Sequence, residues 1–150
     1  MGNYVQSSLI KDEKIVYEAQ IHWFIFIAPV LLLLIAALFF VGHDPLASVG
    51  SLFLLIGIYK LIWALAIKST TELALTNKRV ISKFGFIKRF TMDTNLGKIE
   101  GVTFHQGIFG RMLRYGSVVI RGTGGDPQTI PYIADPTSFK NAVNNAIDGI

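Results

Sequence analysis

Three histidines are the residues best suited to acid–base or metal chemistry, because a neutral imidazole accepts a proton or a metal ion near pH 7. They are His22, His43 and His105, and no HExxH motif or other paired metal-ligand spacing joins them. The absence of cysteine excludes disulfides and cysteine-based zinc or redox sites. Because the carboxylates are also scattered singly, we expect no metal, no cofactor and no catalytic site, and we predict that the protein is not an enzyme.

Two glycine-containing stretches resemble ligand-binding loops only in part. Residues 122–125 read GTGG, but the Lys-Ser/Thr pair and the following helix of a phosphate-binding loop are missing, so a hairpin turn is expected. Residues 107–110 read GIFG, which matches the GxxG of KH nucleic-acid domains. The apolar centre, Ile108 and Phe109, and the long apolar runs elsewhere argue against this use. We predict no nucleic-acid partner.

Basic residues form the candidate binding surfaces. One group surrounds two predicted turns, and a second lies in residues 108–115, where apolar and basic side chains mix as they do in interfacial membrane segments. The candidates for lipid or partner contact are Lys78, Arg79, Lys83, Lys88, Arg89, Arg111 and Arg114. Three interpretations stay open: ordinary solvated charge at strand edges, contact with anionic lipid, and contact with a protein partner.

Two apolar runs determine how all of these residues are held. Trp23–Val41 contains 19 residues without a charge, and residues 46–67 contain 22 with a single charge, Lys60. Each run approaches the ~20 residues that a helix needs to cross a hydrocarbon core, and in lipid a helix satisfies every backbone polar group internally. The four residues 42–45 join them. The sequence therefore predicts a transmembrane hairpin, with both of its ends on the same side of the membrane.

The basic residues beside the hairpin predict which side that is. Residues 42–45 contain no Lys or Arg, whereas Lys11 and Lys14 precede the first run and Lys68 follows the second. Positively charged flanks stay in the cytoplasm. We therefore expect a multi-pass membrane protein with both termini cytoplasmic. Residues 68–150 carry eleven basic against six acidic side chains, which favours contact with an anionic inner leaflet.

Two features inside the second run have alternative interpretations. Gly50, Gly57 and Ala64 recur every seven residues and form one small-residue stripe on a helix, suited to packing within the hairpin or between protomers. Lys60 is either an interface anchor beside Tyr59 and Trp63 or a charge that faces a partner or a lipid headgroup.

Outside the hairpin the pattern indicates β structure. Residues 1–8 are polar and expected to be loose, and residues 14–22 alternate as a short strand that must pair with or pack on the following domain. Turn signals, Gly116 among them, separate the later segments. These predicted strands are 72–75, 79–84, 87–93, 99–106, 117–122 and 128–133.

The chain ends in a predicted helix. Asp135 and Pro136 suit the N-cap and first helical position, and Phe139, Val143 and Ile147 then share one face with Ala146. The fold class is therefore membrane α + β: a two-helix transmembrane hairpin followed by a β-barrel or sandwich that a C-terminal helix caps. We divide the chain into an N-terminal cytoplasmic arm (1–22), the hairpin (23–67) and a cytoplasmic domain (68–150).

The order of the segments and the residues within them resemble a known family. The stretches TTELALTNKRVISKFGFIKR, MDTNLGKIEGVTFHQGIFGRMLRYGSVVIRGTGG and IPYIADPTSFKNAVN, with KIVYEAQIHW before the hairpin, resemble the bacterial pleckstrin-homology (PH) family of membrane-anchored proteins. The resemblance implies a PH-like barrel of about seven strands with a capping helix, and it implies that the membrane is the bacterial inner membrane. In eukaryotic PH domains, basic residues around the first hairpin loop bind phosphoinositide headgroups, and Lys78 and Arg79 lie near the corresponding place.

These observations predict a membrane-anchored PH-like interaction or scaffolding module at the cytoplasmic face, in contact with anionic lipids or a protein partner. Exposed sheet edges and the small-residue stripe further predict a homo-oligomer. The alternative is an accessory subunit of a membrane enzyme or transporter, in which Lys60, His43 and Asp44 handle an ion or substrate.

Overall fold

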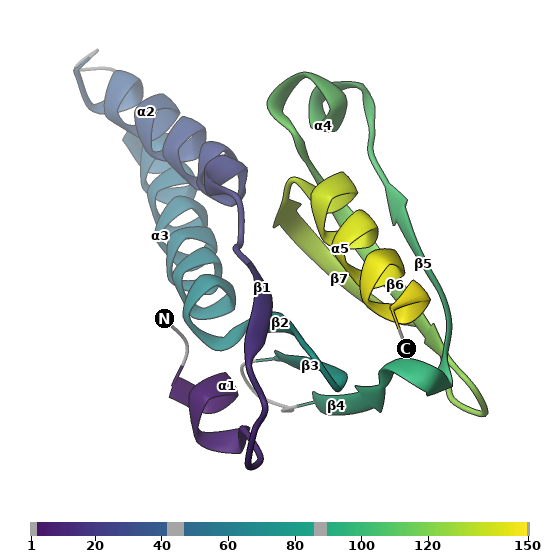
Figure 1. The fold of residues 1–150 in the computed structure, drawn as a ribbon. Coiled ribbons are helices and arrows are strands. Elements are labelled where there is room, and N and C mark those ends of the chain that lie inside the picture. The colour runs from purple at the N-terminus through teal and green to yellow at the C-terminus, as the bar shows by residue number, and fades with distance from the viewer. Residues whose placement is uncertain (1–2, 42–46, 86–89, 150) are drawn as a thin grey trace. The chain divides into compact units, whose positions relative to one another are not determined.

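The computed structural model describes residues 3–41, 47–85 and 90–149, and the chain forms two compact units (Figure 1). Residues 1–22 and 70–150 form one unit, which we call the β domain, and residues 23–69 form the other, the helical hairpin. The N-terminal 22 residues, which the sequence division separates as an arm, thus belong to the same folded unit as the C-terminal part. The hairpin is an insertion within the β domain.

Both apolar runs are helical, as predicted. A 3₁₀ turn, η1 (Trp23–Phe26), leads into α2 (Ile27–Val41), and α3 spans Ala47–Thr70. By length and composition alone, the two helical segments are able to cross a membrane. Only 17% of the most apolar 18-residue stretch in each segment is buried. The predicted connection, with His43 and Asp44, lies outside the described residues.

The small-residue stripe of α3 faces α2. A Cβ atom on Gly50 would lie 2.9 Å from the Cβ of Phe39, and one on Gly57 would lie 2.9 Å from a Leu33 methyl group. Ala64, one heptad further on, is 3% exposed. At the base of the hairpin the Lys68 ammonium lies 5.3 Å from the Phe26 ring centroid. The glycines therefore let the two helices of one chain approach closely.

The β domain begins with a four-stranded antiparallel sheet in the order β1-β2-β3-β4. Its strands are β1 (Ile15–Ala19), β2 (Glu72–Thr76), β3 (Arg79–Phe84) and β4 (Phe90–Asn95). The prediction that residues 14–22 pair with the following domain is confirmed, because β1 pairs antiparallel with β2.

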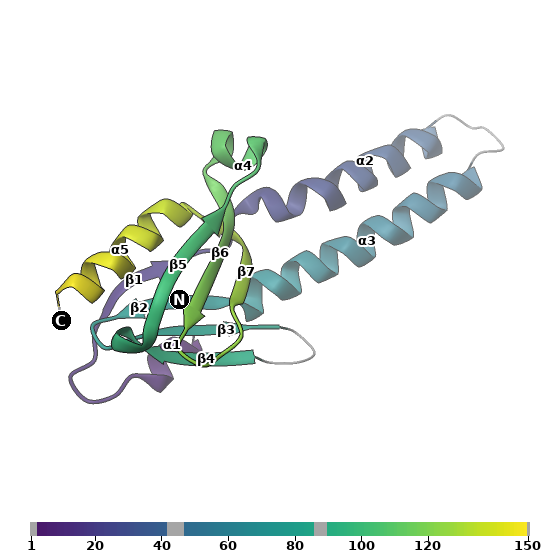
Figure 2. The same ribbon diagram turned by 90° about the vertical axis from the view of Figure 1, so that its right-hand side faces the viewer.

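A second antiparallel sheet completes the seven strands. The 3₁₀ turn η2 (Leu96–Lys98) leads into β5 (Ile99–His105), which pairs with β6 (Tyr115–Gly122), and β6 pairs with β7 (Gln128–Ala134). A short helix, α4 (Ile108–Leu113), joins β5 to β6. Figure 2 shows the strands of this sheet crossing those of the first sheet at a steep angle, as in orthogonal β packing.

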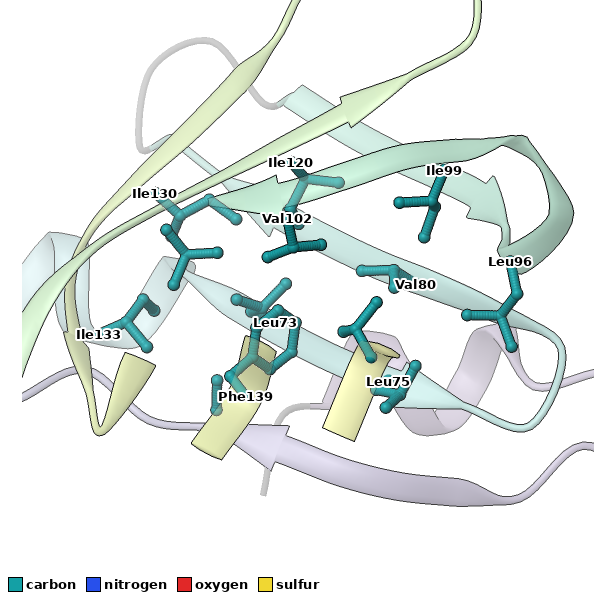
Figure 3. Packing of buried hydrophobic residues seen from close by; sticks show 13 residues of the cluster. Leu73, Leu75, Val80, Leu96, Ile99, Val102, Ile120, Ile130, Ile133 and Phe139 are labelled. Atoms are coloured by element: carbon teal, nitrogen blue, oxygen red, sulfur yellow. The ribbon is translucent and has the colours of Figure 1, made fainter. Parts of the chain in front are cut away.

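The core lies between the two sheets and the C-terminal helix α5 (Pro136–Asp148). Leu73 and Val80 of the first sheet face Val102 and Ile120 of the second, and Phe139 of α5 closes the core (Figure 3). The predicted cap is also present. The side chain of Asp135 accepts a hydrogen bond from the Ser138 amide, and Pro136 follows at the first helical position.

Two local predictions are wrong. Residues 3–8 are not loose: α1 (Asn3–Ser8) buries Val5, 2% exposed, against Ala74 and Ile81. The Val5 amide donates to the Glu72 carboxylate at 3.0 Å, a contact across 67 residues that a local pattern does not reveal. Gly116 lies inside β6 instead of in a turn. The position requires glycine because a Cβ there would lie 2.6 Å from the His105 carbonyl oxygen of the neighbouring strand.

Candidate lipid-contact surface

The chain enters and leaves the helical hairpin at one end of the first sheet. β1 ends at Ala19, four residues before the hairpin begins at Trp23, and β2 starts at Glu72, two residues after α3 ends. Ala19 pairs with Leu73, so the two strand ends lie side by side. We call this region of the β domain the hairpin end. Glu72 pairs in turn with Lys83, which places Lys83 at the same end.

The second sheet also reaches the hairpin end. Beyond β1, the Gln20 carbonyl accepts a hydrogen bond from the Ala134 amide at 2.8 Å, and the His22 amide donates to the Tyr132 carbonyl at 2.6 Å. The His22 ring stacks on Tyr115 with 5.3 Å between ring centroids. Because Tyr115 directly follows α4 and its C-cap, the end of α4 lies close to His22, the last residue of the β domain before the hairpin.

α4 is held to the β domain by its smallest residue. Gly110 is buried, and a Cβ there would lie 2.6 Å from the Tyr115 carbonyl oxygen. The Gln106 amide group donates to the carbonyls of Gly110 and Tyr115 at 3.4 and 3.2 Å. Arg114 ends the helix in the left-handed conformation, with φ of 56°. The other residues of α4 and its C-cap Arg114 are exposed.

The free faces of α4 are apolar and basic. Ile108, Phe109 and Met112 are 80%, 66% and 75% exposed, and Arg111 and Arg114 are also exposed. These two arginines thus lie exposed among apolar side chains, and their contact with lipid or a partner stays a prediction. The sequence analysis missed the helix itself, although apolar residues at 108, 109 and 112 follow helical spacing.

Lys83 contacts an acidic and an aromatic side chain of the β domain. Its ammonium lies 3.9 Å from the Glu72 carboxylate and 4.6 Å from the Tyr4 ring centroid. Its side chain is 20% exposed. Lys88 and Arg89, predicted beside the same turn, lie outside the described residues.

Lys78 and Arg79 lie at the opposite end of the first sheet, in and after the β2–β3 turn. Arg79 is not a free cation there. Its guanidinium bonds both carboxylate oxygens of Glu13 at 2.9 and 3.1 Å, Asp93 at 3.0 Å and the Ser8 carbonyl oxygen. The Glu13 side chain is fully buried. Arg79 therefore ties α1 and its following loop to the sheet instead of presenting charge to a ligand.

The Glu13 carboxylate is stabilised in its ionised form. Burial acts to raise its pKa, but hydrogen bonds from Arg79, the Ile10 amide and the Thr76 hydroxyl outweigh that effect and leave the pKa below its usual value. The sequence offered no signal for this pair, because Glu13 and Arg79 are 66 residues apart.

The described residues bring few metal-binding or acid–base side chains together. No group of three or more His, Cys, Asp or Glu side chains there is placed to hold a metal ion. His22 is packed on Tyr115, and burial lowers its pKa. A groove between β4 and the β6–β7 turn is lined by one ionisable side chain, Asp126, with Met92 and Gln128 among its neighbours. It thus contains no acid–base pair.

The family model described as "Bacterial PH domain" matches residues 23–146. The chain belongs to the bacterial PH domain family. In this bacterial PH domain the match covers the helical hairpin and every element from β2 to most of α5. It begins after β1, although β1 is the first strand of the folded sheet. No curated protein and no solved structure shows a significant match to the chain.

Proposed function

We propose that this bacterial PH domain is a membrane-anchored interaction module that acts through contacts instead of catalysis. The helical hairpin crosses the inner membrane twice and holds the β domain at the cytoplasmic face. One observation carries the proposal: η1 with α2, and α3, are two apolar segments long enough to span, and they are inserted between the paired strands β1 and β2. Two spans inserted in this way return the chain to the side from which it started.

Charge supports the cytoplasmic assignment. Lys11 and Lys14 precede the hairpin and Lys68 lies in the last turn of α3, whereas residues 42–45 contain no Lys or Arg. Lys and Arg beside short loops keep those loops in the cytoplasm. The eleven basic and six acidic residues of 68–150 also favour an anionic membrane surface, where each basic residue contributes about 1 kcal/mol.

A reporter fusion tests the proposal. A reporter joined after Ile150 should show cytoplasmic activity, and one inserted between His43 and Asp44 should show periplasmic activity. A periplasmic signal from the fusion after Ile150 would remove both the topology and the functional proposal that depends on it.

Self-assembly is part of the proposal, with fewer candidate surfaces than the sequence predicted. One edge of β1 is already paired with β2, and Gly50 and Gly57 already face α2. Contacts between copies would therefore use other surfaces, such as the outer edges of β1, β4 and β5, each of which pairs with one strand in the described structure. The mass of the protein in nanodiscs checks this. We expect a multiple of 16.6 kDa after correction for lipid, and a single protomer at all concentrations would contradict it.

A further inference from the structure

The exposed apolar side chains of the β domain are concentrated on α4. Six large apolar residues of this unit are exposed in the described structure, and four of them, Ile108, Phe109, Met112 and Leu113, belong to this helix. Their exposed fractions reach 80%, 66% and 75% at the first three. An apolar cluster of this kind, beside basic residues, marks a surface that is covered by a partner or a membrane.

The geometry of α4 turns this cluster away from the β domain. Residues 108 and 112, and likewise 109 and 113, are four apart and share one side of a helix. Gly110 lies on the attached side, where the Tyr115 carbonyl leaves no room for a side chain. The Gln106 side chain fixes the same contact through the carbonyls of Gly110 and Tyr115. The apolar side is therefore held outward by the way the helix is attached.

The position of α4 identifies what covers it. Tyr115, which follows the C-cap Arg114, stacks on His22, and His22 is bonded directly to Trp23, the first residue of the apolar helices. A helix of six residues is about 9 Å long. The His22 contact thus connects the C-terminal end of α4 to the residue directly before Trp23, where the proposed span begins. A headgroup layer is itself about 5 to 8 Å thick.

The charges of α4 agree with a lipid surface. Arg111 and Arg114 are exposed, and neither forms an ion pair with any residue that the structure describes. Apolar side chains on one side and arginines beside them are the pattern of segments that lie at the boundary between headgroups and acyl chains.

We propose that α4 inserts into the cytoplasmic leaflet beside the helical hairpin. Ile108, Phe109 and Met112 enter the boundary between headgroups and acyl chains, and Arg111 and Arg114 bind anionic headgroups. The inference rests on the proposed function, since it requires the hairpin to span the same bilayer. The β domain is then held to the membrane at a third point besides its two chain connections, which fixes its orientation on the surface.

Single-cysteine variants test this directly, because the native chain has no cysteine. Phe109→Cys, Asn144→Cys and Leu55→Cys are each labelled with an environment-sensitive fluorophore, and the full-length protein is reconstituted into vesicles. Asn144 is exposed on α5 and Leu55 is 66% exposed in the middle of α3. The vesicles contain phospholipids with a nitroxide quencher on the upper part of the acyl chain or near its end.

We expect the probe at 109 to be quenched severalfold more by the shallow nitroxide than the probe at 144, and the probe at 55 to be quenched most by the deep nitroxide. Quenching at 55 without quenching at 109 overturns the insertion of α4 and leaves the hairpin proposal intact. Loss of quenching at both 55 and 109 overturns the two together. A probe at 109 that is shielded from water but not quenched by either lipid shows a protein partner on α4, which also overturns the inference.

The role of the arginines has its own comparison. In the Phe109→Cys protein, shallow quenching should be higher in phosphatidylglycerol-containing vesicles than in pure phosphatidylcholine. Arg111→Gln with Arg114→Gln should abolish that difference, whereas Arg121→Gln, exposed at the far end of β6, should preserve it. Equal quenching in the two lipid compositions before any arginine is changed would remove Arg111 and Arg114 from the proposal.

Discussion

The rings of His22 and Tyr115 stack with their centroids 5.3 Å apart and their planes 23° apart. This contact joins the last residue before the helical hairpin to the first residue after α4 and its cap. Stacked aromatic pairs contribute about 0.5 to 1.5 kcal/mol beyond the area they bury. The pair therefore couples the attachment point of the hairpin to the segment that presents α4.

Removal of the His22 ring should loosen that coupling. In His22→Ala we expect faster amide hydrogen exchange at residues 20–22 and 106–114, because the stacked contact at their junction is lost. His105→Ala is the matched control, since His105 is exposed at the end of β5. Mass spectrometry of the exchanged protein gives the measurement. Equal exchange at residues 106–114 in the native protein and His22→Ala would show that the stack does not hold α4.

Removal of the Arg79 side chain should destabilise the β domain strongly. Arg79→Met leaves the buried Glu13 carboxylate without its cation, and loss of one partner from a buried pair costs about 3 to 5 kcal/mol. Lys78→Met removes the neighbouring exposed charge and should change stability by less than about 0.5 kcal/mol. Chemical unfolding in nanodiscs, followed by limited proteolysis, compares the two. Similar stabilities for both variants would contradict the structural role of Arg79.

Acid should remove part of the stability that Glu13 provides. Its pKa in the folded β domain is below the value of 4.5 expected for the unfolded chain, so between these values the unfolded state binds more protons. The contribution is complete above pH 4.5 and is lost as the pH falls through the folded pKa. The unfolding free energy of the native protein should therefore fall more steeply below pH 4.5 than that of Glu13→Gln/Arg79→Met. Parallel curves would exclude this contribution.

Packing between α2 and α3 should be sensitive to side-chain size at Gly50. A Cβ there would lie 2.9 Å from the Cβ of Phe39, so Gly50→Ile must separate the helices or displace Phe39. Overpacking of this kind costs about 1 to 3 kcal/mol. Ser51→Ile adds a similar side chain at an exposed position and serves as the control. We expect SDS to unfold Gly50→Ile at a lower mole fraction than Ser51→Ile, and identical midpoints would refute close helix packing at this position.

Local sequence patterns predicted most of the fold because they reflect short-range constraints. Alternating residues predicted β3 within its observed limits of Arg79–Phe84, and Asp135 with Pro136 predicted the start of α5. Apolar length predicted α2 and α3. Each of these signals depends on residues within one element, so no tertiary contact was needed to detect them.

The site was less predictable because its properties depend on distant neighbours. Arg79 appeared to be a free turn cation, but Glu13, 66 residues away, neutralises it. Residues 3–8 appeared loose because Val5 packs against Ala74 and Ile81, which follow the helical hairpin in the sequence. Arg111 and Arg114 were identified from composition, whereas the contact of the neighbouring Tyr115 with His22, 93 residues earlier in the chain, emerged only from the structure.

Cysteine accessibility in intact cells is the most direct test of the central claim that the hairpin holds the β domain at the cytoplasmic face. A membrane-impermeant thiol reagent is applied to cells that express His43→Cys or Asn144→Cys, before and after the inner membrane is opened. The proposal predicts labelling of His43→Cys in intact cells and of Asn144→Cys only after the membrane is opened. Labelling of Asn144→Cys in intact cells would contradict it.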